Sequence, residues 1–360
     1  MEEYLKQLVA FYPVSSSQES VLALLQFAKQ HFEEHGLKTE ILSYKGVHNL
    51  YATTSGKKHT RLLLQGHIDV VPANNQPFSV DDEKYYGRGV YDMLYATACY
   101  MQLVADLSDQ IHNFDIGFML SGDEETGGLD GVKAFLEDGY RTQVCILPDA
   151  GEGFGTLNIA AKGIYHCNVR IHGKAHHGSR PWEGDGAAAK LVHFLGEFES
   201  VFDTSSLDNT TLTIAKLNAG EADNQGPAYA DVTLDIRYSD KTDLKRVKQA
   251  LNELLERYNG EITEMLEGDD YQLDTSHPDV KEFLQRYEEH HGGAIELVKA
   301  HGSSDARFLA AKGIPVIMLR PDGGGAHGDA EWVSKNSTKK FYELLKDYVR
   351  TIANNGENNE

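Results

Sequence analysis

The chain has 360 residues, enough for two domains of ordinary size. It is 41% hydrophobic and 25% charged, which is typical of a globular protein and excludes a largely disordered one. The formal net charge of −21 argues against a nucleic-acid partner, because binding to phosphates depends on basic patches. The same charge suits cationic ligands such as metal ions.

Nothing in the sequence indicates a membrane partner or an export signal. No run of about eighteen apolar residues occurs, and the N-terminus opens with two acidic residues and an amphipathic helix. The three cysteines, Cys99, Cys145 and Cys167, are widely spaced and form no paired motif. We therefore expect buried, unpaired thiols in a cytoplasmic protein.

The first half of the chain alternates between extended and helical segments. The expected strands are 39–43, 49–53, 61–65, 114–120 and 144–147. The expected helices are 19–35, 94–107 and 129–138. This alternation predicts an α/β fold with a mostly parallel mixed sheet and helices on both of its faces.

The pattern changes after Gly163 and returns near the C-terminus. The intervening order is strand, helix, two strands, helix and strand, which predicts a compact α+β unit inserted into the first domain. We expect a catalytic domain formed by residues 1–162 and 274–360, interrupted by a smaller domain at 163–273. The returning part contains expected helices at 279–290 and 304–311, strands at 295–298 and 315–319, and a final helix from Thr338.

Two polar motifs occur where the first pattern predicts loops. His67 and Asp69 follow a buried strand, where a carboxylate can fix the histidine tautomer that offers a lone pair to zinc. Asp92 follows two glycines just before a helix. Taken separately, a buried core histidine and a helix N-cap aspartate are adequate explanations of these two motifs.

Three further acidic or histidine-bearing loops follow later segments. Glu124 and Glu125 lie in a run of three acids, where one glutamate can bind a metal and its neighbour can take a proton from metal-bound water. A solvated acidic turn is the alternative. Asp149 ends another apolar strand, and His327 lies in a glycine-rich loop. Together with His67 and Asp92, these loops provide two histidines and three carboxylates, a donor set suited to two zinc ions sharing one carboxylate.

These motifs, in the order in which they occur along the chain, resemble those of a di-zinc hydrolase family. That family includes aminoacylase, acetylornithine deacetylase, succinyl-diaminopimelate desuccinylase and glutamate carboxypeptidase. The resemblance covers nearly the whole chain. It implies two Zn²⁺ per subunit, with Co²⁺ or Mn²⁺ as substitutes, and a ferredoxin-like inserted domain acting as a lid or as the surface of a homodimer. The implied roles are His67 and Asp149 on one zinc, Glu125 and His327 on the other, Asp92 as bridge, Asp69 orienting His67, and Glu124 as general base.

The inserted domain and the segment after it contain further matches to the family, and these imply substrate-binding residues. His177 aligns with a histidine that reaches the active site, often across a dimer, although an exposed polar loop is the alternative. Asn224 and Arg237 match two more elements, and Arg237 could instead pair with Asp235 on the same strand face. Ser303 matches a pocket-lining segment, or it caps the following helix.

Several positions depart from the family pattern, namely Leu94, Tyr95, Gly186 and Ala330. None of them removes a predicted ligand or the base. Asp149 bears on the substrate, because this ligand tends to be aspartate in aminopeptidase-like or dipeptidase-like relatives and glutamate in carboxypeptidase-like or deacetylase-like ones. We therefore expect cleavage of dipeptides or short peptides by zinc-bound hydroxide. The alternatives are an N-acyl-amino-acid deacylase and an inactive metal-binding homologue, although the retained Glu124 argues against the latter.

Overall fold

The computed structural model describes residues 1–74, 76–300, 302 and 304–354, and these divide into two compact units. The first unit contains Met1–Ile159, Gln272–Ala300 and the chain from Ser304 onward. The second contains Ala160–Tyr271. The chain enters the second unit within β8 (Thr156–Ala161) and leaves it within β15 (Tyr271–Gln272). The assignment of this second unit as a lid or dimerisation domain stays a prediction.

A six-stranded mixed sheet forms the centre of the first unit. Its order is β1 (Lys38–Tyr44), β2 (Val47–Thr53), β6 (Ile116–Ser121), β3 (His59–His67), β7 (Arg141–Ile146) and β17 (Val316–Ile317). The ladders joining β6, β3, β7 and β17 are parallel, while β1 and β2 are antiparallel additions at one edge. The apolar run Leu62–Leu64 is buried within β3, as expected for a strand covered on both faces. The predicted sheet is confirmed.

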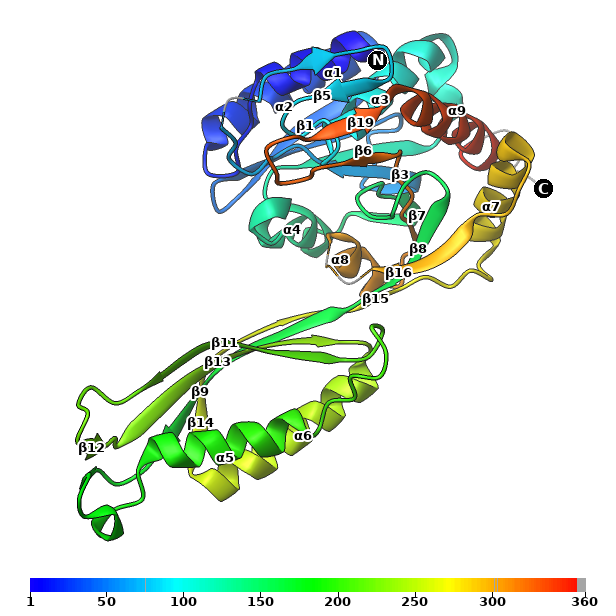
Figure 1. The fold of residues 1–360 in the computed structure, drawn as a ribbon. Helices are drawn as coiled ribbons and strands as arrows, with labels where there is room; N and C mark the ends of the chain where they lie inside the picture. The colour runs from blue at the N-terminus through cyan, green and yellow to red at the C-terminus, as the bar shows by residue number, and fades with distance from the viewer. Residues whose placement is uncertain (75, 301, 303, 355–360) are drawn as a thin grey trace. The chain divides into compact units, whose positions relative to one another are not determined.

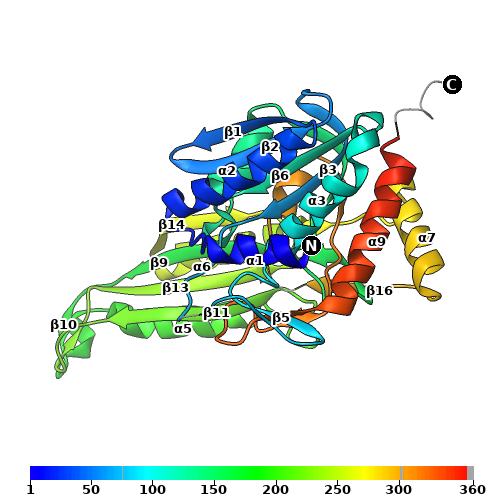
Figure 2. The ribbon, with the colours of Figure 1, turned by 90° about the horizontal axis from the view of Figure 1, so that it is seen from above.

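Helices cover this sheet on both sides, as Figure 1 shows. The helices of the unit are α1 (Glu2–Ala10), α2 (Gln18–Glu34), α3 (Leu94–Leu107), α4 (Ala134–Glu137), α7 (Pro278–His291), α8 (Ala306–Ala310) and α9 (Lys335–Ile352). The α7 and α9 helices lie side by side (Figure 2), joined by an edge-on contact of the Phe283 and Tyr348 rings at 5.2 Å. Strand β16 (Glu296–Ala300) follows α7.

The continuous helix predicted over 129–138 is wrong. The chain forms a π turn at Leu129–Lys133 and a regular helix only at Ala134–Glu137, with Gly131 in a non-helical conformation between their ends. A side chain at Gly131 would meet Oδ1 of Asp123 at 2.1 Å, so the backbone there packs directly against the preceding acidic loop. Tertiary contact therefore outweighs local helix propensity in this segment.

A second, smaller sheet in the same unit was not predicted. Its order is β18 (Gly323–Gly324), β19 (Trp332–Ser334), β5 (Lys84–Tyr86) and β4 (Ser79–Val80). Strands of two or three residues are too short for a periodic hydrophobic pattern, which explains the omission. This sheet pairs the segment before Asp92 with the segment after His327.

The second unit is a four-stranded antiparallel sheet with two helices on one face (Figure 1). Its chain order is β9 (Gly163–His172), α5 (Ala187–Glu199), β11 (Thr211–Ala219), β13 (Tyr229–Tyr238), α6 (Lys241–Tyr258) and β14 (Gly260–Gly268). The sheet order β11-β13-β9-β14 is that of a ferredoxin-like fold. Alternate residues of β9, such as Cys167 and Val169, are buried against Phe194 and Phe198 of α5. Two short strands, β10 (His176–His177) and β12 (Gln225–Gly226), pair beyond this sheet.

Candidate metal centre

Three of the predicted site segments follow neighbouring parallel strands of the large sheet. His67 is the last residue of β3, the short helical turn Glu124–Thr126 follows β6, and Asp149 follows β7. Because β6, β3 and β7 are adjacent and parallel, their carboxyl ends meet at one edge of the sheet. Polar side chains at this edge of an open α/β sheet form the usual ligand site.

Two further residues reach the same place from the smaller sheet. Asp92 follows β5, and His327 lies in the connection between β18 and β19. The strand predicted at 315–319 is shorter in the structure, since β17 is only Val316–Ile317, and β18 lies between it and the loop of His327. Asp92 is also no helix cap, because α3 has no side-chain cap and the Asp92 carboxylate faces the two histidines.

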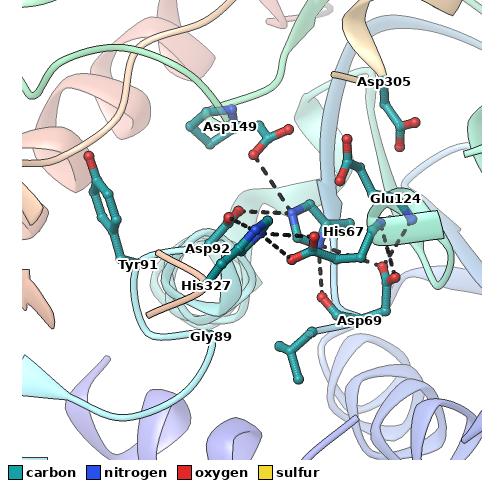
Figure 3. Close-up of polar contacts among 12 residues, drawn as sticks. His67, Asp69, Gly89, Tyr91, Asp92, Glu124, Asp149, Asp305 and His327 are labelled. Carbon is teal, nitrogen blue, oxygen red and sulfur yellow. Dashed lines mark hydrogen bonds and ion pairs between the residues drawn. The ribbon is translucent and has the colours of Figure 1, made fainter. Parts of the chain in front are cut away.

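The Asp92 carboxylate lies between His67 and His327, as Figure 3 shows. Its Oδ1 is 3.1 Å from Nε2 of His67, and its Oδ2 is 3.2 Å from Nε2 of His327. On the outer sides, Oδ1 of Asp149 is 3.7 Å from Nε2 of His67, and Oε2 of Glu125 is 2.9 Å from Nε2 of His327. The five residues thus form two groups that share one carboxylate.

These separations fit a metal centre. Ligand atoms bound tetrahedrally to zinc at about 2.0 Å lie about 3.3 Å from one another. The four contacts between histidine nitrogens and carboxylate oxygens, 2.9 to 3.7 Å, bracket that value. Among the described residues, two sets of potential ligand atoms lie within 4.8 Å of one another. One set is His67, Asp92 and Glu125, and the other is His67, Glu124 and Asp149.

The electrostatics of the cluster also favour a cation. Burial raises the pKa of Glu125 to about 7, and the hydrogen bond to Asp92 raises the pKa of His327 to about 9. Burial alone would lower the pKa of His67, but contacts with Asp149 and other carboxylates raise it well above its ordinary value. Carboxylates crowded into a low-dielectric site repel one another unless positive charge compensates. A divalent ion supplies that charge directly.

Glu124 lies close to His67 and Asp149, as Figure 3 shows. Burial, followed by the negative charge of Asp149, raises the pKa of its carboxyl well above the ordinary value. Its backbone N–H donates to Oδ1 of Asp69 at 3.1 Å, and the N–H of Glu125 donates to Oδ2 at 3.2 Å. The Asp69 carboxylate therefore holds the acidic turn in place.

The orientation of His67 comes from Asp69, although through a different atom from the one predicted. Nδ1 of His67 lies 2.9 Å from the backbone carbonyl oxygen of Asp69 and 3.6 Å from its carboxylate. A carbonyl oxygen only accepts hydrogen bonds, so Nδ1 carries a proton, and a metal ion would bind His67 through Nε2.

Sequence reasoning missed Glu331 and Arg88, which contact the backbone next to the proposed ligands. The buried Glu331 carboxylate accepts from Nη1 of Arg88 at 2.7 Å and from the backbone N–H of Asp92 at 3.0 Å. The available sequence signal is the acidic side chain of Glu331 itself, which directly follows Ala330. Asp305 is a third omission: it is buried, and this burial raises the pKa of its carboxyl to about 8.

The substrate-binding residues predicted in the inserted domain belong to the second unit. His177 is exposed on β10 with its Nδ1 2.9 Å from Oγ of Ser179, and Asn224 is exposed in the loop before β12. Arg237 on β13 donates to the Asp235 carboxylate from Nε at 2.8 Å and from Nη2 at 3.2 Å. The structural pair considered as the alternative for Arg237 is therefore present. Ser303 lies outside the described residues.

The structure also bears on the expected state of the cysteines and on the expected absence of a membrane-spanning helix. The three cysteines are buried and free. None of the helices in the described part of the chain is long and apolar enough to cross a membrane.

The chain is similar in sequence and in fold to known proteins. A profile of Peptidase family M20/M25/M40 matches residues 63–351. A succinyl-diaminopimelate desuccinylase from Rickettsia akari is 26% identical over 381 residues, covering 97% of this chain and 99% of that protein. A tripeptidase from Staphylococcus aureus has a TM-score of 0.78 at 21% identity, covering 97% of this chain and 99% of that one. The aminopeptidase PepT of Bacillus cereus has a TM-score of 0.78 at 19% identity, with coverages of 97% and 98%.

The fold and the site define a metal-dependent hydrolase built on a mixed α/β sheet with an inserted α+β unit. Because the profile match spans most of the sequence, the chain belongs to Peptidase family M20/M25/M40. This family is metal-dependent, generally on zinc, and its members hydrolyse peptide or amide bonds. The family resemblance inferred from the motifs is therefore confirmed.

Proposed function

We propose that the protein is a zinc-dependent peptidase that cleaves dipeptides or short peptides with two zinc ions per chain. His67 and Asp149 hold one ion, Glu125 and His327 hold the other, and Asp92 bridges them. The observation that best supports this assignment is the position of Asp92, whose two oxygens face different histidines at 3.1 and 3.2 Å. A shared carboxylate of this kind is the expected link in a two-metal site.

When held by these residues, zinc would supply Lewis-acid chemistry for the scissile carbonyl and would lower the pKa of water at the site. Glu124 then acts as the general base through its side-chain carboxylate, which accepts a proton from the attacking water. As the C–N bond breaks, the same carboxyl group returns that proton to the leaving nitrogen. Burial of Glu124 supports this role, since a raised pKa brings a carboxyl group closer to working pH.

The choice of a peptide over an acylated amino acid rests on Asp149, because aspartate at this position resembles the aminopeptidase-like and dipeptidase-like relatives. A second candidate function is removal of an acyl group from an N-acyl amino acid. It is supported by the 26% identity to a succinyl-diaminopimelate desuccinylase over nearly the full length of both chains. A panel of dipeptides, N-acetyl and N-succinyl amino acids on the zinc-loaded enzyme separates the two. Turnover confined to the acyl substrates would replace the first candidate with the second.

The mechanism is tested with the variant E124A. Removing the base should lower kcat by at least about a hundredfold, the usual contribution of a positioned acid–base group, while bound zinc stays at the wild-type level. Unchanged turnover would rule out Glu124 as the base. Loss of zinc together with turnover would instead make Glu124 a ligand.

Two further aspects of the proposal concern the whole chain. The free, buried cysteines support a reducing, cytoplasmic location. We also propose that the second unit contributes the surface of a homodimer, and that His177, Asn224 and Arg237 bind the substrate, as their resemblance to family motifs implies. The molar mass in solution tests the dimer, and a monomer would remove that part of the proposal.

A further inference from the structure

The carboxylate of Glu331 is saturated with hydrogen bonds from the segment that leads to Asp92. Its Oε2 accepts from Nη1 of Arg88 at 2.7 Å and from the backbone N–H of Gly89 at 2.9 Å. Its Oε1 accepts from the backbone N–H groups of Tyr91 at 2.8 Å and Asp92 at 3.0 Å. Glu331 is only 2% exposed, so these charge-assisted bonds are shielded from water and hold the segment firmly.

A second set of bonds runs in the same direction, with donors on Arg88 and Gln76 and an acceptor in the loop that contains His327. Nη2 of Arg88 donates to the carbonyl oxygen of Gly328 at 2.9 Å, and Nε2 of Gln76 donates to the same oxygen at 2.8 Å. Gly328 directly follows His327. Arg88 and Glu331 therefore connect two loops that lie more than two hundred residues apart in the sequence, each loop contributing one charged side chain.

Backbone bonds also shape the loop around His327: the N–H of Gly328 donates to the carbonyl oxygen of Gly325 at 2.9 Å, and the N–H of Gly87 donates to the carbonyl oxygen of Glu331 at 3.2 Å. The His327 side chain is 54% exposed, and its backbone has a φ of 62°, a left-handed conformation that costs a non-glycine residue free energy. Glycines flank it closely in the sequence. The contacts of Arg88 and Glu331 with this loop therefore help to keep Nε2 of His327 within 3.2 Å of Oδ2 of Asp92.

We propose that Glu331 and Arg88 are positioning residues that lock the Asp92 loop to the His327 loop and so set the geometry of the bridged metal pair. The inference rests on the proposed function, because it takes Asp92 and His327 as metal ligands. Neither positioning residue is among the proposed metal ligands. Their effect is exerted through the backbone of Asp92 and of the residue after His327.

Breaking an ion pair that only stabilises the fold should leave metal binding unchanged, and the chain contains such a pair for use as a control. Arg61 and Asp279 form a two-bond pair, Nη1 to Oδ2 at 2.7 Å and Nη2 to Oδ1 at 2.5 Å, with side chains 18% and 11% exposed. Arg61 lies near the start of β3, whereas His67 is its last residue. D279N should therefore lower stability without changing the metal site.

The test uses full-length apo-protein titrated with Zn²⁺ against a competing chelator, and with Co²⁺ followed by its visible absorption. In E331Q, the amide nitrogen faces two N–H donors whichever way the side chain is turned, so the Asp92 loop loses its anchor. We expect the second metal equivalent to bind at least about tenfold more weakly, with an altered Co²⁺ spectrum. R88K keeps the positive charge, but a lysine cannot reproduce the two bonds that Arg88 donates, to Glu331 and to the carbonyl oxygen of Gly328. It should therefore also weaken binding of the second metal equivalent.

The inference would be overturned if E331Q and R88K bound both metal equivalents with wild-type affinity and had an unchanged Co²⁺ spectrum. They would then show only a loss of stability, as is expected of the control D279N. If E331Q does not fold, R88K alone decides between the two outcomes. Failure of the proposed function is distinguishable, because it would appear in the wild type as uptake of fewer than two zinc ions or in E124A as retained turnover.

Discussion

The carboxylate of Asp69 accepts the backbone N–H of Glu124 at 3.1 Å, so the residue that orients His67 also anchors the proposed general base. The same carboxylate accepts the N–H of Glu125 at 3.2 Å and the hydroxyl of Ser15 at 2.8 Å. Because His67 is oriented by the backbone oxygen of Asp69, the side chain and the main chain of one residue serve different parts of the site.

Because the carboxylate and the backbone of Asp69 make separate contacts, the variant D69N should affect only the contacts of the carboxylate. An amide group in place of the carboxylate faces N–H donors, which loosens the acidic turn, whereas the backbone contact to His67 remains. We expect kcat to fall about 10-fold to 100-fold with little loss of bound zinc. The matched control is D115N, since Oδ2 of Asp115 accepts the backbone N–H of Arg61 near the start of β3. Loss of zinc in D69N at unchanged kcat would contradict this account.

Gly128 offers a test of how tightly the acidic turn is packed. It has a φ of 65°, and an added Cβ would lie 2.0 Å from Oδ1 of Asp305. G128A should therefore displace the turn, lower the free energy of unfolding by about 2 kcal/mol and reduce turnover. G292A isolates the backbone effect, because Gly292 has a φ of 71° and no atom near its Cβ position. Denaturant unfolding and initial rates of both variants make the comparison, and equal effects would argue against the clash.

Asp106 makes stability depend on acid pH. Partial burial would raise its pKa, but hydrogen bonds from Lys346 and Tyr342 outweigh burial and lower the pKa to about 2. A group whose pKa is lower in the folded state stabilises the protein above the unfolded value near 4, and that stabilisation is lost as pH falls towards 2. D106N should therefore cost about 1 kcal/mol at pH 7, after allowance for solvent screening.

The measurement for Asp106 is the free energy of unfolding of wild type and D106N at pH 7 and at pH 2.5. The difference between the two proteins should shrink markedly at the lower pH. A difference that stays constant across this range would show that the contacts of Asp106 with α9 do not depend on its charge.

The sequence was sufficient to predict the large sheet and the proposed ligands at its edge. Apolar runs such as Leu62–Leu64 identify buried strands, and the polar residue that follows each run marks the ligand-bearing end. The inserted unit was equally clear, because the alternation of β9 differs from those continuous runs.

The remaining part of the site depends on contacts that no local pattern encodes. The two loops bearing Asp92 and His327 meet through strands of two or three residues, below the length at which periodicity is detectable. The bond between Arg88 and Glu331 joins positions 243 residues apart. The helical pattern after Gly128 was misleading because Gly131 packs against Asp123, a tertiary contact that local propensity does not include.

The assignment of the metal ligands is tested most directly by an anomalous difference map, recorded at the zinc absorption edge from crystals of the zinc-loaded protein. The account predicts two peaks about 3.5 Å apart, each about 2.0 Å from one oxygen of Asp92, with the Glu124 carboxylate bound to neither. A single peak, two peaks that Asp92 does not bridge, or a direct bond from Glu124 to zinc would contradict it.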